Sequence, residues 1–159
     1  ALGCSKLSET TLETLCKELP AIAPKMENDR AILRAIHFFE ENNRVTDMMQ
    51  AVSTKDRKQI LKILKQSGQS SWELLQNCYA VSDYREQKVS LCLALTEIFL
   101  KELGDGCCRI HGGGFAGVIM CVLPKQAVHA YTRFMETYVG KDAIYPMKIR
   151  QVGAVHLEK

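Results

Sequence analysis

Apolar residues recur at helical spacing through the first two-thirds of the chain, which predicts a run of helices. The pair Thr10-x-x-Glu13 has the form of a capping box, so a short helix is expected to begin there. Pro20 is expected to end it, because proline lacks the amide hydrogen that a helix interior needs. Asn28 is placed to cap a longer second helix. The residues predicted on its buried face are Ile32, Ile36 and Phe39.

Three further helical segments are predicted before residue 105, each opened by a residue that can cap a helix. Their expected limits are Thr54 to Gly68, a segment that begins at Ser70, and Asp83 to Gly104. Large apolar side chains in this region, Trp72 and the pair Met48–Met49, are expected in the core.

The pattern changes at Gly106, where short runs rich in β-branched residues replace the helical spacing. Four strands and one helix are predicted, with these limits: strands Cys107–His111 and Val118–Leu123, a helix from Pro124 to about Gly140, and strands Tyr145–Arg150 and Val152–Leu157. Helices followed by a β-β-α-β-β unit predict an α+β fold, with helices packed on an antiparallel sheet. No long linker interrupts residues 1–159, so a single domain is expected.

Composition narrows the class of protein. The chain has 159 residues, of which 47% are hydrophobic and 25% charged, as in ordinary soluble domains. Its seven cysteines include no C-x-x-C pair, which disfavours a zinc site and predicts a reducing, cytoplasmic environment. No apolar run is long enough for a membrane helix. The net charge of +3 is too small to indicate nucleic acid, although the C-terminal third is locally more basic and would suit an anionic ligand.

The most unusual string is His111-Gly112-Gly113-Gly114-Phe115-Ala116-Gly117. Glycines at this density allow backbone conformations with φ > 0 and let a ligand or another segment approach closely. One interpretation is a hairpin turn. Another is a loop whose amide groups bind an anion.

Two enzymatic motifs match parts of this string but fail on their surroundings. A dinucleotide fingerprint needs its third glycine inside a helix, and the residues after Gly117 predict a strand. The esterase motif HGGG needs a G-x-S-x-G nucleophile elbow, which the sequence lacks. A P-loop, G-x-x-x-x-G-K-[ST], is also absent.

The string from Arg109 to Gly117 resembles the third signature motif of the GHMP small-molecule kinases. Three further segments resemble those of the galactokinases within that family. They are Arg30 to Val45, Ser67 to Ser70, and Lys148 to Ala154. The chain departs from the usual pattern at Gly68, His111 and Ala116, which leaves the sugar open.

The resemblance implies roles for individual residues. Gly112, Gly113, Gly114 and Gly117 would lie beside the phosphates of ATP, with Phe115 as an anchor of the loop. The alternative for these glycines is a plain turn. Possible accessory residues are Arg109, His111, Ser67 and Ser70, for which solvated, structural or capping roles are the alternatives. Arg30, Arg34, His37, Glu41 and Arg44 form a polar helix stripe, either solvated or docked on another domain.

The resemblance further implies an ATP- and Mg²⁺-dependent kinase that phosphorylates a sugar at its anomeric hydroxyl. Both ligands would be bound mainly by an N-terminal domain that this chain lacks, and no catalytic residue is expected within it. The expected partners are that domain and a small-molecule sugar, with neither nucleic acid nor membrane. The alternative is a stand-alone binding or regulatory module with the same fold.

Overall fold

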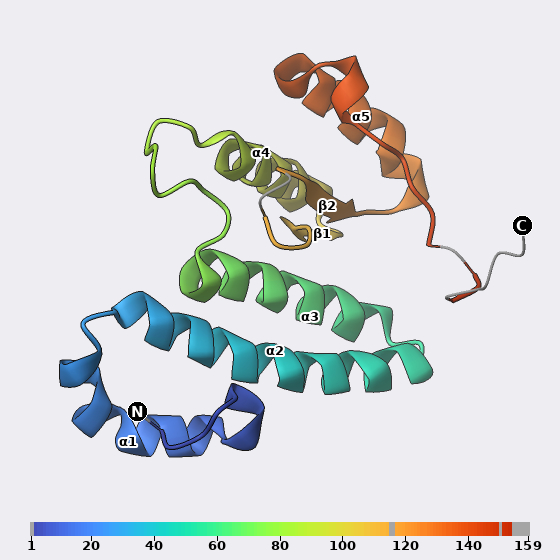
Figure 1. Ribbon diagram of the computed structural model, residues 1–159. Coiled ribbons are helices and arrows are strands. Elements are labelled where there is room, and N and C mark those ends of the chain that lie inside the picture. The colour runs from blue at the N-terminus through green and yellow to red at the C-terminus, as the bar shows by residue number, and fades with distance from the viewer. Residues whose placement is uncertain (1, 115–116, 150, 154–159) are drawn as a thin grey trace, which may run out of the picture. The chain divides into compact units, whose positions relative to one another are not determined.

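The computed structural model describes residues 2–114, 117–149 and 151–153, and its chain separates into two compact units, residues 1–123 and 124–159. Within the described residues, the first unit carries four α-helices and a two-stranded antiparallel sheet, and the second carries one α-helix (Figure 1). The predicted α+β class is confirmed.

Helix α1 (Leu12–Met26) begins one residue later and runs further than predicted. Thr11 is its cap, with its hydroxyl accepting the amide of Thr14 at 3.1 Å. The predicted end at Pro20 is wrong, since the helix continues through Pro20. The physical reason is burial: Leu15 and Ile22, on either side of that proline, pack into a core shared with the next helix. This burial offsets the cost of proline inside a helix, about 3 kcal/mol or more, which combines a lost hydrogen bond with a clash of the ring against the preceding turn.

Helix α2 (Asp29–Ser53) begins where predicted, and the side chain of Asn28 caps it by accepting the amide of Ala31 at 3.1 Å. Ile32 and Phe39 are buried as expected, while Ile36 is half-buried. The core between α1 and α2 consists of Leu15, Ile22, Ala35 and Phe39.

Helix α3 (Arg57–Ser70) differs from its prediction at both ends. Thr54 closes α2, and Asp56 caps α3 by accepting the amide of Gln59 at 3.0 Å. The predicted stop at Gly68 is also wrong, because the chain continues directly into a π-helical turn, Ser71–Leu75. A methyl group on Gly68 would lie 2.9 Å from Cβ of Arg109. Glycine therefore serves close packing of this helix on a strand.

Helix α4 (Lys88–Leu103) ends at Gly104, as predicted, with a left-handed φ of 72°. The predicted start at Asp83 is wrong. The carboxylate of Asp83 accepts the amide of Arg85 at 3.0 Å in a turn, and Gln87 precedes the first helical residue. Asp83 thus satisfies a local turn, which competes with helix capping for the same side chain.

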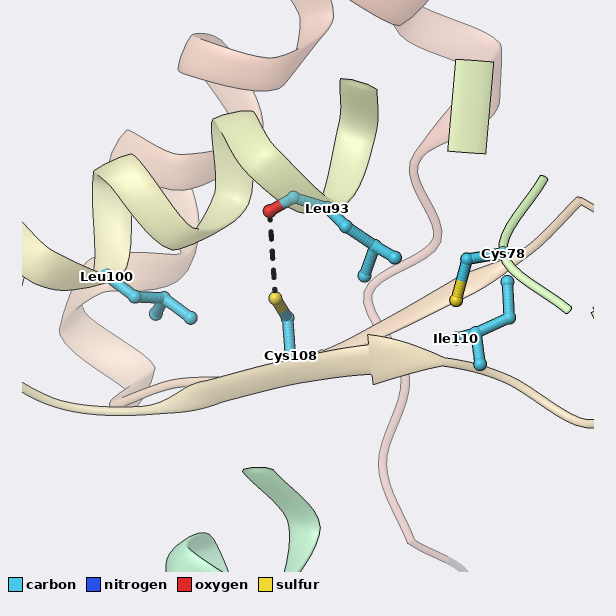
Figure 2. Close-up of a cluster of buried hydrophobic side chains, with 5 residues drawn as sticks. All are labelled: Cys78, Leu93, Leu100, Cys108 and Ile110. Atoms are coloured by element: carbon cyan, nitrogen blue, oxygen red, sulfur yellow. Dashed lines mark hydrogen bonds between the residues drawn. The ribbon is translucent and has the colours of Figure 1, made fainter. Parts of the chain in front are cut away.

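Strands β1 (Cys107–Ile110) and β2 (Ile119–Val122) form the predicted antiparallel hairpin. Strand β1 contacts α3 and α4 (Figure 1). Successive residues of β1 face different helices. Arg109 packs against Gly68 of α3, whereas Cys108 and Ile110 point to the α4 side. Figure 2 shows the resulting core. Its buried residues are Cys78, Leu93, Leu100, Cys108 and Ile110.

In the second unit, a 3-10 turn (Lys125–Ala127) leads into helix α5 (Val128–Val139), which ends at Gly140 as predicted. The strand predicted from Tyr145 is wrong over residues 145–149, which have no ladder partner among the described residues and leave Ile149 98% exposed. Alternating apolar residues form a strand only where a neighbouring strand takes their backbone hydrogen bonds. The predicted strand from Val152 to Leu157 is described only to Gly153, where residues 151–153 form no strand; Arg150 and the remainder lie outside the described residues.

Candidate functional site

The glycine-rich string connects β1 to β2. The amide of His111 donates to the Val118 carbonyl at 2.9 Å, and the amide of Gly117 donates to the Gly114 carbonyl at 3.1 Å. Three glycines have left-handed backbones, with φ of 61° at Gly112, 84° at Gly114 and 70° at Gly117. Other residues adopt these angles only with strain, so the density of glycine has a local cause. The predicted anchor Phe115 lies outside the described residues.

The two ends of this loop differ in their surroundings. Gly114 lies directly against the backbone carbonyl of Asn77, so close that a side chain there would overlap it. At Gly112, by contrast, an added methyl group would meet open space, and both Gly112 and Gly113 are exposed. The loop is therefore anchored at Gly114 and presents the backbone of residues 112–113 to solvent.

Arg109 and His111, the residues flanking Ile110 at the start of this loop, differ in their exposure. His111 is exposed, whereas Arg109 is half-buried and donates from Nε to the Ile110 carbonyl at 3.0 Å. The Arg109 charge also acts on Glu41 of α2 and on His37 one turn earlier. Strand β1 thus places a cation among the polar residues of the helices.

Polar side chains of α2 and α3 pair with one another in a half-buried cluster. Glu41 accepts the Ser67 hydroxyl at 2.7 Å and Arg44 Nε at 2.6 Å. One turn away, Nδ1 of His37 lies 2.9 Å from the Ser70 hydroxyl. Ser67 lies inside α3 and Ser70 is its last residue. Both hydroxyls bond side chains of α2 and so hold the two helices together. We call these residues, His37, Glu41, Arg44, Ser67 and Ser70, the α2–α3 cluster.

Burial and charge shift two pKa values in this cluster. For Glu41, burial favours the neutral acid, but hydrogen bonds from Ser67 and Arg44, together with nearby positive charge, lower the pKa below its usual 4.5. For His37, burial lowers the pKa below its usual 6.5, assisted by Arg44 and Arg109 and opposed by Glu41. The carboxylate is thus charged and the imidazole neutral at pH 7.

This shift makes stability depend on pH through His37. Because the unfolded chain binds the histidine proton more tightly, we expect the free energy of unfolding to decrease as pH falls below 6.5. Urea denaturation between pH 7.5 and 5 measures this slope. His37→Gln should flatten it, whereas replacing the exposed His129 of α5 in the same way should leave it unchanged. A slope that persists in His37→Gln would contradict the assignment.

The remaining arginines of the predicted stripe have separate environments. Arg30 donates to the Gln76 carbonyl at 3.0 Å, just beyond the π-helical turn, while Arg34 is exposed. The stripe is therefore not uniformly solvated, because three of its residues, His37, Glu41 and Arg44, form hydrogen bonds within the α2–α3 cluster. Docking of this face on another domain stays a prediction.

An open groove of about 560 Å³ lies beside the cluster, and sequence patterns did not indicate it. Polar groups of Glu41, Arg44, Ser67 and Arg109 line one part and apolar side chains line the rest. Met49 in its wall is 71% exposed and Trp72, elsewhere on the chain, is 41% exposed, so their predicted core positions are wrong. The apolar lining residues are Val45, Met48, Met49, Val52, Ile63 and Leu64.

The described residues bear on the kind of site in two respects. They contain no group of three His, Cys, Asp or Glu side chains that could hold a metal ion. Within the same ranges, no helix combines the length and apolar character needed to cross a membrane.

The amino-acid sequence of this chain is similar to those of known galactokinases. A galactokinase of Actinobacillus pleuropneumoniae serotype 3 is 29% identical over 110 residues, or 69% of this chain. A galactokinase of Glaesserella parasuis serovar 5 is 28% identical over 119 residues, or 74% of this chain. The chain is related to galactokinases. No protein-family model matches it, and no solved structure does.

The relationship to galactokinases extends along most of this chain but little of theirs. The matched regions cover 26% and 28% of the two relatives, so the chain spans between a quarter and a third of their length. A second galactokinase of A. pleuropneumoniae is matched over 84% of this chain and 32% of its own length. The activity of the whole enzyme is therefore not attributable to these residues alone.

Proposed function

We propose that this chain is the C-terminal domain of a galactokinase-type sugar kinase, which phosphorylates its sugar at the anomeric hydroxyl. The observation that carries the proposal is the match to galactokinases over 69% to 84% of the chain but only 26% to 32% of each relative. A domain cut from a longer enzyme accounts for both proportions. Galactose is the sugar that the relatives' name suggests.

In this proposal the glycine loop adjoins the nucleotide phosphates. The exposed backbone at Gly112 and Gly113 supports it, because amide groups without overlying side chains can approach a phosphate closely. ATP supplies the transferred phosphoryl group, and phosphoryl transfer depends chiefly on positioning and charge stabilisation. Anchoring at Gly114 would keep the loop in place. In this proposal Mg²⁺ accompanies ATP, and both are held mainly by the part of the enzyme that lies outside these residues.

A non-catalytic module with the same fold is the second candidate. The α2–α3 cluster favours it, because the acidic and imidazole groups that could serve acid–base chemistry already bind other side chains of this chain. Glu41 contacts Ser67 and Arg44, and His37 contacts Ser70. Such pairing suits a structural role.

Galactose-dependent formation of ADP distinguishes the two candidates. We expect the full-length protein that contains this chain to show it, and the chain alone to show none. Gly113→Ala in the full-length protein should raise the KM for ATP on the order of tenfold, because the added methyl group would hinder the close approach of a phosphate to the loop backbone. Lys17→Ala, an exposed change on α1 outside the polar stripe and the loop, is the control.

Thermal melting of each variant separates binding from folding. If Gly113→Ala lowers only the melting temperature, the loop is a structural turn. If the full-length protein forms no ADP with galactose or other hexoses, the non-catalytic module is the better assignment.

A further inference from the structure

Two cysteines face each other directly across the hairpin. In the antiparallel register, Cys108 of β1 is the partner of Cys121 of β2. The amide of His111 donates to Val118, so that pair is hydrogen-bonded, and such pairs alternate along the ladder. Counting back three positions makes the cysteine pair a non-hydrogen-bonded one. Its Cα atoms are then about 4.5 Å apart, within the range of about 4.4–6.8 Å that a disulfide spans.

Both side chains lie on the α4 side of the hairpin. Cys108 is buried in the core beneath α4, and Cys121 packs against that core while remaining partly accessible. Figure 2 shows the Cys108 side chain pointing from β1 towards the Leu93 carbonyl, 3.9 Å away. Its sulfur also lies 3.5 Å from Oε1 of Glu97, one turn further along α4.

We propose that Cys108 and Cys121 form an oxidisable dithiol, a modification site at which hydrogen peroxide introduces a cross-strand disulfide. The accessible thiol reacts first and the buried thiol closes the bond. This inference rests on the hairpin and on α4, and is independent of the proposed kinase function.

The two steps conserve atoms and electrons. Peroxide oxidises the Cys121 sulfur to a sulfenic acid and leaves as one water molecule. The Cys108 sulfur then attacks the Cys121 sulfur, an S–S bond forms, and the sulfenic hydroxyl leaves with a proton as a second water. Two thiols and one peroxide thereby give one disulfide and two waters.

Glu97 has a defined part in the second step. The Cys108 thiol donates to its carboxylate, so Glu97 is placed to accept the proton as the sulfur attacks. Burial, and after it the charge of Glu97, raise the pKa of the Cys108 thiol, which keeps it protonated at neutral pH. Cys108 therefore needs a base at the moment of attack, and Cys121 is the first target of the oxidant.

Cys107 provides an internal comparison. It is adjacent to Cys108 and also buried, but successive side chains in a strand point to opposite faces. Its register partner is Val122, which has no thiol. Burial raises the pKa of Cys107 to about 11, so this thiol is also protonated at neutral pH. A cysteine of similar burial thus lacks the partner that the proposal requires.

The disulfide would enclose the glycine loop, because residues 111–118 lie between the two linked positions. Closing this ring would hold the adjoining ends of β1 and β2, from which the loop starts and ends, at a fixed separation. Oxidation would therefore restrict the loop while leaving its sequence and its contact with Asn77 unchanged.

Mass spectrometry of the reduced, purified protein after treatment with hydrogen peroxide tests the proposal. We expect a loss of two hydrogen atoms and a non-reduced peptide joining Cys108 to Cys121. Cys121→Ser should abolish this link and Cys107→Ser should leave its rate unchanged. Glu97→Gln should slow closure by about tenfold or more, with the sulfenic acid on Cys121 trapped by dimedone.

Circular dichroism confirms that each variant is folded, and Cys121→Ala replaces Cys121→Ser if serine prevents folding. The proposal is overturned if Cys121 proceeds to sulfinic acid while Cys108 stays reduced. It is equally overturned if Cys108 links to another cysteine, or if the link forms only in denaturant.

Discussion

Gly114→Ala is expected to destabilise the protein by about 3 kcal/mol, whereas Gly112→Ala should cost about 1 kcal/mol. Both glycines have left-handed backbones, with φ of 84° and 61°. Only at Gly114 would the new methyl group also overlap the Asn77 carbonyl, while at Gly112 it meets open space. Both substitutions strain the backbone, so the difference between their losses of stability measures the clash with Asn77. Urea denaturation of the two variants measures it.

Equal losses at the two positions would show that the contact with Asn77 does not anchor the loop. A larger loss of stability in Gly112→Ala than in Gly114→Ala would mean that the Gly112 end of the loop is the restrained one. Either result would remove the structural basis for a loop with one fixed and one exposed end.

Glu41→Ala is expected to lower the free energy of unfolding by about 3 kcal/mol, because it leaves Arg44 without its principal partner. The Arg44 side chain is only 14% exposed, and its second terminal nitrogen is buried without a hydrogen-bond partner among the described residues. The same change also removes the acceptor of the Ser67 hydroxyl. Without Glu41, this partly buried arginine keeps only the contact with the more exposed Glu40.

Glu40→Ala is the matched control for this variant. Glu40 also contacts Arg44, at 3.1 Å, but is 40% exposed, so its loss should cost about 0.5 kcal/mol. Chemical denaturation at pH 7 compares the two. Similar losses would mean that Arg44 is stabilised by either carboxylate and that Glu41 has no special place in the cluster.

Sequence patterns predicted the elements whose limits are set by nearby residues. Asn28 caps α2 through an amide three positions away, and Gly104 ends α4 through its own backbone angle. The hairpin likewise follows from two short β-branched runs around the glycine loop. In each case the interaction lies within a few residues, where pattern and propensity are informative.

The errors arose where distant contacts outweighed a local signal. Pro20 should end a helix, yet burial of its neighbours against α2 carries α1 past it. Gly68 should also end one, yet it remains helical because α3 packs closely on β1. Conversely, Tyr145 opens an alternating pattern that forms no strand in the described residues. Sequence alone did not reveal which partner each segment meets.

In the candidate site, too, local features were predicted and distant contacts were not. The glycine loop and the polar residues of α2 were predicted as features, but not their neighbours. Asn77, against which Gly114 packs, belongs to no motif, and the pairing of Ser67 with Glu41 joins residues 26 positions apart. No periodicity marks such a pair, because its distance is set by how two helices pack.

The two prolines inside α1 have a consequence for how the protein opens. Pro20 and Pro24 each lack an amide hydrogen, so the carbonyls one turn before them, on Cys16 and Pro20, lose their usual helical donors. These positions are exposed, where water can replace the missing bonds. Helix α1 thus gains less from remaining wound than α2 does, and depends on Leu15 and Ile22 for its attachment. It is suited to detach as a separate cooperative segment while α2, α3 and the hairpin remain folded.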